Sequence, residues 1–187
     1  MRYPFLWMAA IWAFSACGGG SGVGADAPDY RDRLDGVQAM FATPAAALPT
    51  TGRLTYTGQM QIDLALPGGV GPYLGDAHMA FDFDSRDAAV TGTVDGFRHG
   101  ADTLSGALTI SEGRIYPDAD PIRDYQFEAE FSGSLSAATE NYRLSGEVYG
   151  DFKGAEAEAV NGVVAGTMRS DTDEVTLFDG SFFGIQD

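Results

Sequence analysis

An unbroken alternation of apolar or small residues with polar ones runs through Leu54-Thr55-Tyr56-Thr57-Gly58-Gln59-Met60-Gln61-Ile62-Asp63-Leu64. Successive side chains of a β-strand point to opposite faces of a sheet, so this period of two predicts a strand with one apolar and one polar face. The run ends at Pro67-Gly68-Gly69, and glycine and proline in succession are typical of turns. We therefore expect a strand that contributes one face to a hydrophobic core.

The same alternation recurs seven more times along the chain, with turn residues between the segments. Eight short strands with no helical segment between them predict an antiparallel meander, and eight strands can close into a barrel whose interior the side chains just fill. The expected fold is all-β, an eight-stranded antiparallel up-and-down barrel over residues 51–187. The predicted strands cover residues 52–64, 78–84, 90–96, 104–110, 126–131, 142–148, 160–168 and 175–183.

The first residues of the chain are typical of an export signal. A basic start at Arg2 and an apolar run from Phe5 to Phe14 precede the only cysteine, Cys17. Phe14-Ser15-Ala16-Cys17 resembles a bacterial lipobox, in which the cysteine is acylated and becomes the first residue of the mature protein. Residues 1–16 are then the lipoprotein signal peptide, and residues 17–28, which begin with glycine and serine, are a lipidated flexible tether. No Asp follows Cys17, which favours the outer membrane.

A short helix is predicted between the tether and the barrel. Asp29 would cap its first turn and Pro44 would stop it, so we expect residues 29–50 to be helix and connector. The apolar residues that recur on one face of this helix are Tyr30, Leu34, Val37 and Phe41.

Composition restricts the partners of the chain. The formal net charge is −16 over 187 residues, and an acidic surface disfavours nucleic acids and anionic lipid headgroups. The charge either solvates the protein or attracts a basic partner. The only cysteine can form no intrachain disulfide, so the fold depends on its core. We expect a monomer that touches the membrane through its lipid anchor only.

Candidate metal ligands are scattered. His78 and His99 have no second histidine or cysteine at ligand spacing, which argues against a zinc or haem site. The acidic turns 118–120 and 171–174 could offer oxygen ligands to Ca²⁺, but neither has the spacing of a calcium loop. We expect solvated turns, with no metal and no cofactor.

No catalytic constellation stands out. The chain has no Gly-x-Ser-x-Gly elbow, and acylation would block the thiol of Cys17. Glu128 and Glu130 share one strand face, as the two acids of a glycosidase can, but a chain with 27 acidic residues produces such pairs by chance. We expect a protein that is not an enzyme.

One segment is more specific than the strand pattern: Gly146-Glu147-Val148-Tyr149-Gly150-Asp151-Phe152-Lys153-Gly154-Ala155-Glu156-Ala157-Glu158-Ala159-Val160-Asn161-Gly162. It resembles the strand–loop–strand signature of the transferrin-binding protein B barrel domains, which also occur in factor H-binding protein and other surface lipoproteins. Val148 stands where the signature has Phe, and Asn161 where it has Gly. The hallmark turn, as we call its characteristic residues, consists of Gly146, Tyr149, Gly150, Gly154, Ala155, Glu158 (or Glu156) and Gly162.

The resemblance covers one barrel, residues 50–187, and implies an outer-membrane, surface-exposed lipoprotein with a binding role. Its ligand, a protein or another molecule of the host or environment, would meet the barrel-rim loops, of which Pro67–Leu74 and Ile115–Asp124 are the longest. The hallmark turn either presents a recognition surface or simply closes the barrel.

Three alternatives remain open at this point. One is a lipocalin-like carrier with a small apolar ligand inside the barrel. Another is a structural lipoprotein that faces the periplasm. The third is a membrane-spanning barrel, whose apolar face would point outward to lipid.

Overall fold

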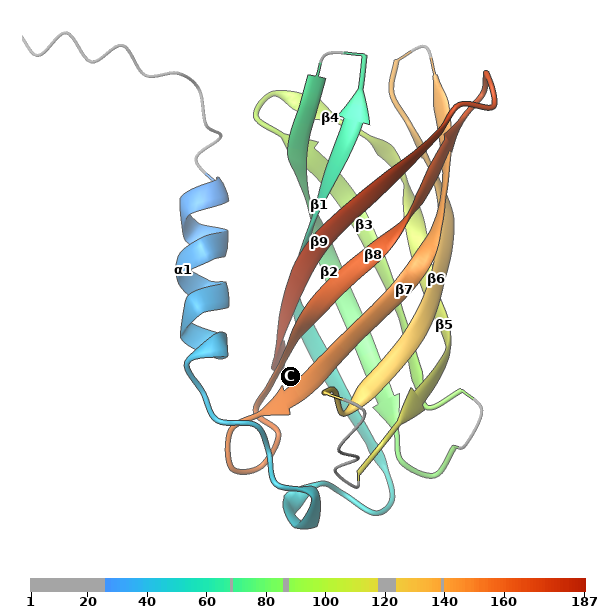
Figure 1. Ribbon diagram of the computed structural model, residues 1–187. Helices are drawn as coiled ribbons and strands as arrows, with labels where there is room; N and C mark the ends of the chain where they lie inside the picture. Colours follow the sequence, from blue (N-terminus) through green and yellow to red (C-terminus); the bar gives the residue numbers. More distant parts are fainter. Residues whose placement is uncertain (1–25, 68, 86–87, 118–123, 139) are drawn as a thin grey trace, which may run out of the picture.

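The chain forms a closed antiparallel barrel with an α-helix packed on its outside (Figure 1). This computed structural model describes residues 26–187 except 68, 86–87, 118–123 and 139. The helices and strands of the described residues are α1 (Asp26–Gln38), the 3₁₀ turn η1 (Ala45–Ala47), β1 (Arg53–Leu66), β2 (Gly69–Asp82), β3 (Val90–His99), β4 (Asp102–Thr103), β5 (Ser105–Ile115), β6 (Phe127–Ser136), β7 (Asn141–Lys153), β8 (Ala159–Ser170) and β9 (Val175–Gln186).

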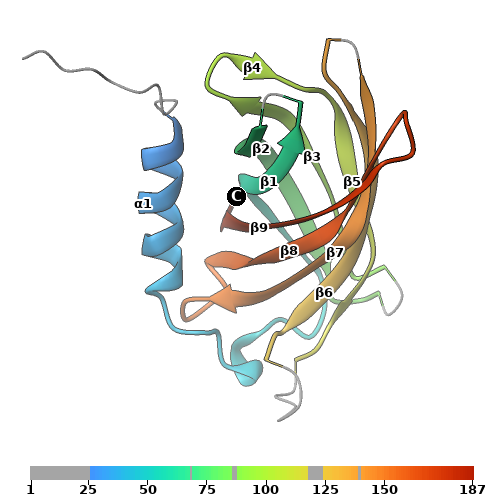
Figure 2. The same cartoon turned by 45° about the horizontal axis from the view of Figure 1, so that its top comes forward.

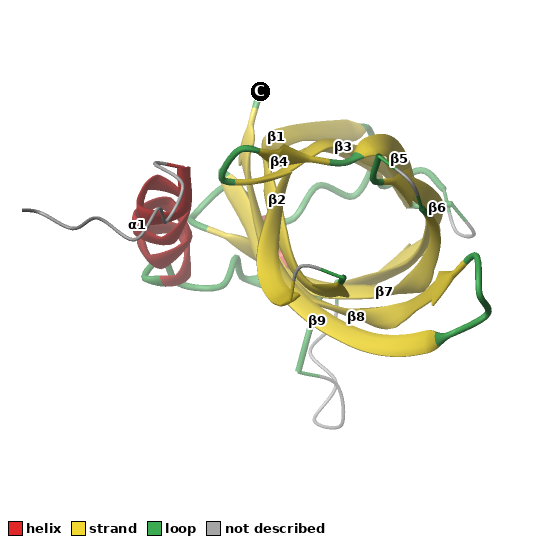
Figure 3. Ribbon diagram, turned by 90° about the horizontal axis from the view of Figure 1, so that it is seen from above, coloured by secondary structure: helices red, strands yellow, loops and turns green. Residues whose placement is uncertain are grey.

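The barrel is the up-and-down meander that the sequence predicts. Each long strand pairs antiparallel with the next long strand in the chain, and β9 returns to pair with β1. Eight strands build the wall, while the two-residue β4 only extends the hairpin after β3. Figure 3 looks down the barrel axis and shows the strands as a ring, with α1 outside it.

The apolar face of the strands points into the barrel. The largest fully buried side chains are mostly aromatic, and their rings pack edge to face: Phe81 lies 4.7 Å from Phe127 and 4.9 Å from Phe152, centroid to centroid. Polar side chains alternate with them on the outside. This is the opposite of the arrangement that the membrane-spanning alternative requires.

The prediction of a loop over Pro67–Leu74 is wrong, because β2 already begins at Gly69 and pairs along its whole length with β1. Pro72 fits inside this strand for a local reason. The Pro72 carbonyl accepts a hydrogen bond from the ring of His99 at 2.8 Å, so its backbone polar group points away from β1 and toward β3. Pairing of β2 with β3 begins only at Leu74, so no strand needs an N–H from Pro72. A proline without an N–H is tolerated at such an unpaired edge.

The expected apolar row of the third strand also needs correction. Gly96 has φ +63° and is exposed, and the register of β2 with β3 shifts between Leu74 and Asp76. This bulge adds one residue, so Phe97 rather than Gly96 takes the next inward position after Val94. A second bulge, at Glu112 with φ +55°, shifts β5 in the same way.

The helix begins earlier and ends earlier than expected. α1 starts at Asp26 rather than at a cap on Asp29, and stops at Gln38, well before Pro44. Phe41 is therefore off the helix and 62% exposed, against the prediction. The chain becomes extended here because Phe41 accepts a hydrogen bond from Gly154 and the next residue bridges to β7.

The other three predicted helix residues do form a buried face. Tyr30, Leu34 and Val37 pack on Phe183, which points out of the barrel beneath the helix. The Tyr30 hydroxyl donates a hydrogen bond of 2.7 Å to the carbonyl of Ser181, and burial raises the pKa of this tyrosine to about 12. α1 thus lies along β8 and β9 (Figure 2). No helix of the described residues has the length and the apolar character needed to cross a bilayer.

Candidate functional site

The predicted lipidation site is not part of the structural description. Cys17 and the first part of the tether lie outside the described residues, which begin at residue 26. Lipidation at this position therefore stays a prediction from the sequence.

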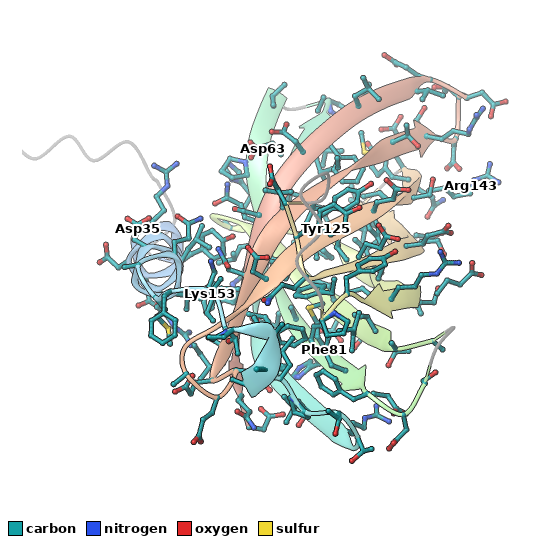
Figure 4. The ribbon with its side chains drawn as sticks, turned by 60° about the horizontal axis from the view of Figure 1, so that its bottom comes forward. Asp35, Asp63, Phe81, Tyr125, Arg143 and Lys153 are labelled. Carbon is teal, nitrogen blue, oxygen red and sulfur yellow. The ribbon has the colours of Figure 1, made fainter. Side chains whose placement is uncertain are left out.

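Part of the hallmark turn lies in the β7–β8 connection at the lower end of the barrel. Gly154, with φ +88°, accepts a hydrogen bond from the Thr43 hydroxyl at 2.8 Å and donates one to Phe41 at 2.9 Å. The buried Ala157 carbonyl accepts a hydrogen bond of 2.7 Å from the Tyr56 hydroxyl inside the barrel. These contacts tie the β7–β8 connection to the segment that follows the helix. Figure 4 shows this end, with Phe81 and Lys153 labelled.

The remaining residues of the hallmark turn lie elsewhere. Ala155, Glu156 and Glu158 are exposed, and a Glu158 carboxylate oxygen accepts a hydrogen bond from the Glu156 amide at 3.1 Å. Gly146 lies farther up β7. Three others line a cleft of 620 Å³ on the outer wall of the barrel, between the end of α1 and the segment before β6: Tyr149, Gly150 and Gly162.

Three tyrosines gather at one edge of this cleft, and we call Tyr116, Tyr125 and Tyr149 the tyrosine cluster. Tyr116 follows β5, Tyr125 precedes β6, and Tyr149 projects from the outer face of β7. The ring centroids of Tyr116 and Tyr125 are 6.1 Å apart, and those of Tyr125 and Tyr149 are 4.9 Å apart. All three side chains are half-buried. The cluster forms a contiguous aromatic patch on the outside of a barrel whose other aromatics are mostly internal.

Carboxylates hold the tyrosine cluster in place. Tyr125 donates a hydrogen bond of 2.7 Å to one oxygen of Glu128, and Tyr116 donates to the other oxygen. Tyr149 donates to Glu147. This hydrogen bond to an anion, with desolvation as the next cause, raises the pKa of Tyr149 to about 12. The Tyr149 phenol is therefore protonated at neutral pH, and all three phenols are oriented by hydrogen bonds before any partner arrives.

A second cleft, of 590 Å³, lies on the other side of Tyr149. Its charges are unbalanced, with four carboxylates against the single guanidinium of Arg114. Glu130 and Glu147 lie directly opposite each other across β6 and β7, and like charges at such positions destabilise a sheet. A basic group from outside would relieve this repulsion. The lining residues are Glu112, Arg114, Glu128, Ala129, Glu130, Glu147 and Tyr149.

The pair of acids singled out from the sequence separates into two environments. Glu128 accepts hydrogen bonds from two phenols, whereas Glu130 is exposed and has no hydrogen-bond partner among the described residues. Glu128 therefore orients two tyrosines, and Glu130 takes no part in these hydrogen bonds.

The other candidates do not converge. His78 is exposed on β2, and the His99 ring packs on Tyr73 and the Pro72 carbonyl. Within the described part of the chain, no three His, Cys, Asp or Glu side chains are placed to hold a metal ion. In the turn 171–174, Asp173 instead pairs with Arg169 at 3.4 Å.

Sequence reasoning missed the tyrosine cluster, although one signal was present. Tyr116 is the second residue of the loop Ile115–Asp124 that was expected at the rim, and Tyr125 follows this loop directly; most of the loop lies outside the described residues. Two aromatic residues at the ends of one loop can meet where the flanking strands pair. Tyr149 lies beside them because it stands opposite Glu128, the residue that both tyrosines contact, in the register of β6 with β7.

Similarity to known proteins is found among solved structures. No family model and no curated protein matches the sequence. Among solved structures, the chain is similar to the vaccine antigen transferrin-binding protein B of Haemophilus parasuis, with a TM-score of 0.45, 16% identity and 78% of this chain covered. The match covers 29% of that protein, so the chain spans less than a third of its length. The sequence resemblance of the hallmark turn and this structural similarity concern the same family of proteins, and neither identifies a ligand.

Proposed function

We propose that this chain is a non-catalytic binding protein, anchored to the outer membrane by lipid at Cys17, that recognises a protein partner through the tyrosine cluster. The observation that carries the proposal is the preformed aromatic patch between two clefts on the outer wall. Tyrosine is enriched in protein interfaces because it offers a large contact area and a polar tip.

The patch is suited to binding because little order must be imposed on it. The phenols of Tyr125 and Tyr149 are already held by Glu128 and Glu147, and side chains that are fixed before binding lose less entropy in a complex. The acidic cleft beside them, with Glu130 opposite Glu147, favours a partner that brings basic side chains.

The interior offers less support for the lipocalin-like alternative. Phe81, Phe127, Phe152 and Phe182 are fully buried and contact one another across the barrel. The glycines of the inner face lie directly against these rings: a Cβ on Gly150 would lie 2.5 Å from the ring of Phe127, and one on Gly162 would lie 2.7 Å from the ring of Phe182. Recognition at the outer wall and at the adjoining loop 115–124 agrees better with this packing.

The binding prediction concerns Tyr125. With full-length protein on a sensor surface and a partner recovered by affinity capture, Tyr125→Ala is expected to weaken binding by about 2 kcal/mol, or roughly thirtyfold, as for interface hot spots. Tyr125→Phe keeps the ring and loses the hydrogen bond to Glu128, so its loss should be smaller. Thr167→Ala, an exposed change on β8, is the control. Equal affinities for all four proteins would refute the role of the cluster.

The anchoring prediction concerns Cys17. Acylation needs the thiol, so Cys17→Ser should abolish incorporation of labelled palmitate and move the protein from the membrane to the soluble fraction of the envelope. Labelling and fractionation of cells that express each form measure both effects. Palmitate in the serine variant would show that the lipid, if present, is attached elsewhere.

A further inference from the structure

The barrel wall is open along part of one seam. Pairing of β1 with β9 ends at Ile62 and Gly180, yet β1 continues to Leu66 and β9 begins at Val175. Both strands keep their other neighbours over this region, because β1 pairs with β2 and β9 with β8 to their ends. Figure 1 shows β9 diverging from the β1–β2 hairpin toward the upper end. We call the facing edges, 63–66 and 175–179, the open seam.

The backbone groups of the open seam point into the gap. The Thr55 carbonyl accepts a hydrogen bond from Asp187 after β9, so every second residue of β1 from Thr55 onward, up to Ala65, directs its N–H and C=O toward β9. Just before β9, the Glu174 carbonyl accepts a hydrogen bond from the Ser170 amide at the end of β8. The backbone N–H and C=O groups of every second residue after Glu174 therefore point toward β8. Leu177 and its neighbours at 175 and 179 therefore direct their N–H and C=O toward the gap.

Between residues 63 and 66 and between residues 175 and 179, the seam edges contain no lysine and no proline, and their charged side chains are Asp63 and Asp179. Native edges carry lysine, proline or a covering segment. Here Leu177 is 81% exposed, Val175 49% and Val70 77%. These three make an apolar row on both sides of the gap, since Val70 pairs with Ala65 of β1. An exposed strand edge with apolar side chains is a template for another strand.

A cleft of 330 Å³ continues the seam into the mouth of the barrel. Its apolar floor includes Leu66, Tyr142 and Met168, and its charged residues are Glu140 and Glu174, with no basic side chain in the lining. Asp63 and Asp179 add two carboxylates at the lower end of the seam.

We propose that the open seam binds an extended segment of a partner protein, antiparallel to β9, in which apolar residues alternate with basic ones. The free N–H and C=O groups of Leu177 would supply main-chain hydrogen bonds, as in other cases of strand addition. The apolar side chains of the segment would contact Leu177 and Val70, and the basic ones the carboxylates of the cleft. This site does not depend on the tyrosine cluster, which lies at the other end of the barrel.

The first test uses hydrogen exchange of backbone amides in the full-length protein, followed by NMR. In the free protein, the amides of Ala65 and Leu177 should exchange much faster than those of Gln61 and Ser181, which are paired across the same two strands. A seven-residue peptide that alternates valine and lysine should then slow exchange at Leu177. The same peptide with glutamate in place of lysine should bind about tenfold more weakly.

Variants separate the main chain from the side chain. Leu177→Pro removes the N–H that points into the gap but none that pairs with β8, so the fold should persist and peptide binding should be lost. Leu177→Thr keeps the N–H and should weaken binding severalfold. The control is Val163→Thr, an exposed valine on β8 whose strand is paired on both sides, and it should bind normally.

Four outcomes would overturn the proposal. Slow exchange of Leu177 in the free protein would show a closed seam. If exchange of the Leu177 amide slows as the protein concentration rises, in the absence of peptide, the open seam binds a second copy of the chain. Peptide-induced shifts confined to Tyr125 and Tyr149 would place the binding at the tyrosine cluster, and shifts of Tyr142 and Met168 with a fatty acid but not with the peptide would indicate a small apolar ligand.

Discussion

Phe127→Ala is expected to lower the free energy of unfolding by about 3–5 kcal/mol, the range measured for deletion of a buried ring with a residual cavity. Phe127 is fully buried, and its ring lies 4.7 Å from Phe81, 5.3 Å from Phe152 and 6.2 Å from Phe182. Its neighbours come from three other strands, so the wall cannot collapse into the space. Urea unfolding followed by far-ultraviolet circular dichroism measures the loss.

Glu130→Ala is the matched control for this change. Glu130 lies three positions along β6 from Phe127 but on the outer face, and its removal should change stability by less than about 0.5 kcal/mol. Glu128 would be a poor control, because two phenols donate hydrogen bonds to it. If Glu130→Ala unfolds the protein and Phe127→Ala does not, the two faces of β6 have been assigned the wrong way round.

The strands could be predicted from the sequence because one face of each is buried. A slip of one residue would turn the whole apolar set of a strand to solvent, so the pattern from Leu54 to Leu64 specifies both the strand and its inward face. What the pattern does not contain is an inserted residue. At Gly96 and Glu112 the bulges shift the alternation, and the trace in the sequence is only that Phe97 is out of step with Val94.

The ends of elements depended on contacts that are distant in the sequence. Phe41 continues the helical period of Tyr30 and Val37, but pairing of the next residues with β7 pulls it out of the helix. Gly71-Pro72 looks like a loop, yet the strand β2 continues through it because Pro72 faces an edge that has no partner at that level. At both places the local sequence predicted the wrong backbone conformation, because pairing with a strand distant in the sequence determined it.

The candidate site was predictable only in part. The loop between Tyr116 and Tyr125 was expected at the rim. Tyr149 and the carboxylates beside it join this loop only through the register of β6 with β7, which sets Glu128 opposite Tyr149 and Glu130 opposite Glu147. The open seam likewise depends on where β1 and β9 stop pairing. Such relations between strands are not encoded in any one segment.

The glycines of the hallmark turn have a structural explanation in the barrel interior. Gly150 lies opposite Gly162, and Gly146 opposite Gly166, across β7 and β8. Each of these positions faces an aromatic ring at a distance that leaves no space for a side chain; a Cβ on Gly150, for example, would lie 2.5 Å from the ring of Phe127. The signature by which the chain resembles transferrin-binding protein B barrels is therefore, at its glycines, a packing requirement.

Gly162→Ala is accordingly expected to destabilise the protein by about 3 kcal/mol, at the upper end for overpacking. The new Cβ would lie 2.0 Å from the Tyr149 carbonyl oxygen and 2.7 Å from two ring atoms of Phe182. Both belong to packed elements, because Tyr149 is in β7 and the Phe182 ring is fully buried. The backbone of β8 must therefore move away from β7, and the thermal midpoint should fall with the free energy of unfolding.

Gly36→Ala provides the same chemical change where nothing opposes it. Gly36 is an exposed residue of α1 at which an added methyl group would meet no atom within 4 Å, and alanine in a helix is favoured over glycine by about 1 kcal/mol. The two variants should thus move the urea midpoint in opposite directions. If Gly162→Ala is as stable as the wild type, the close approach of β7 and β8 is not a requirement of the fold, and the conspicuous glycines of this segment would need an explanation in binding instead.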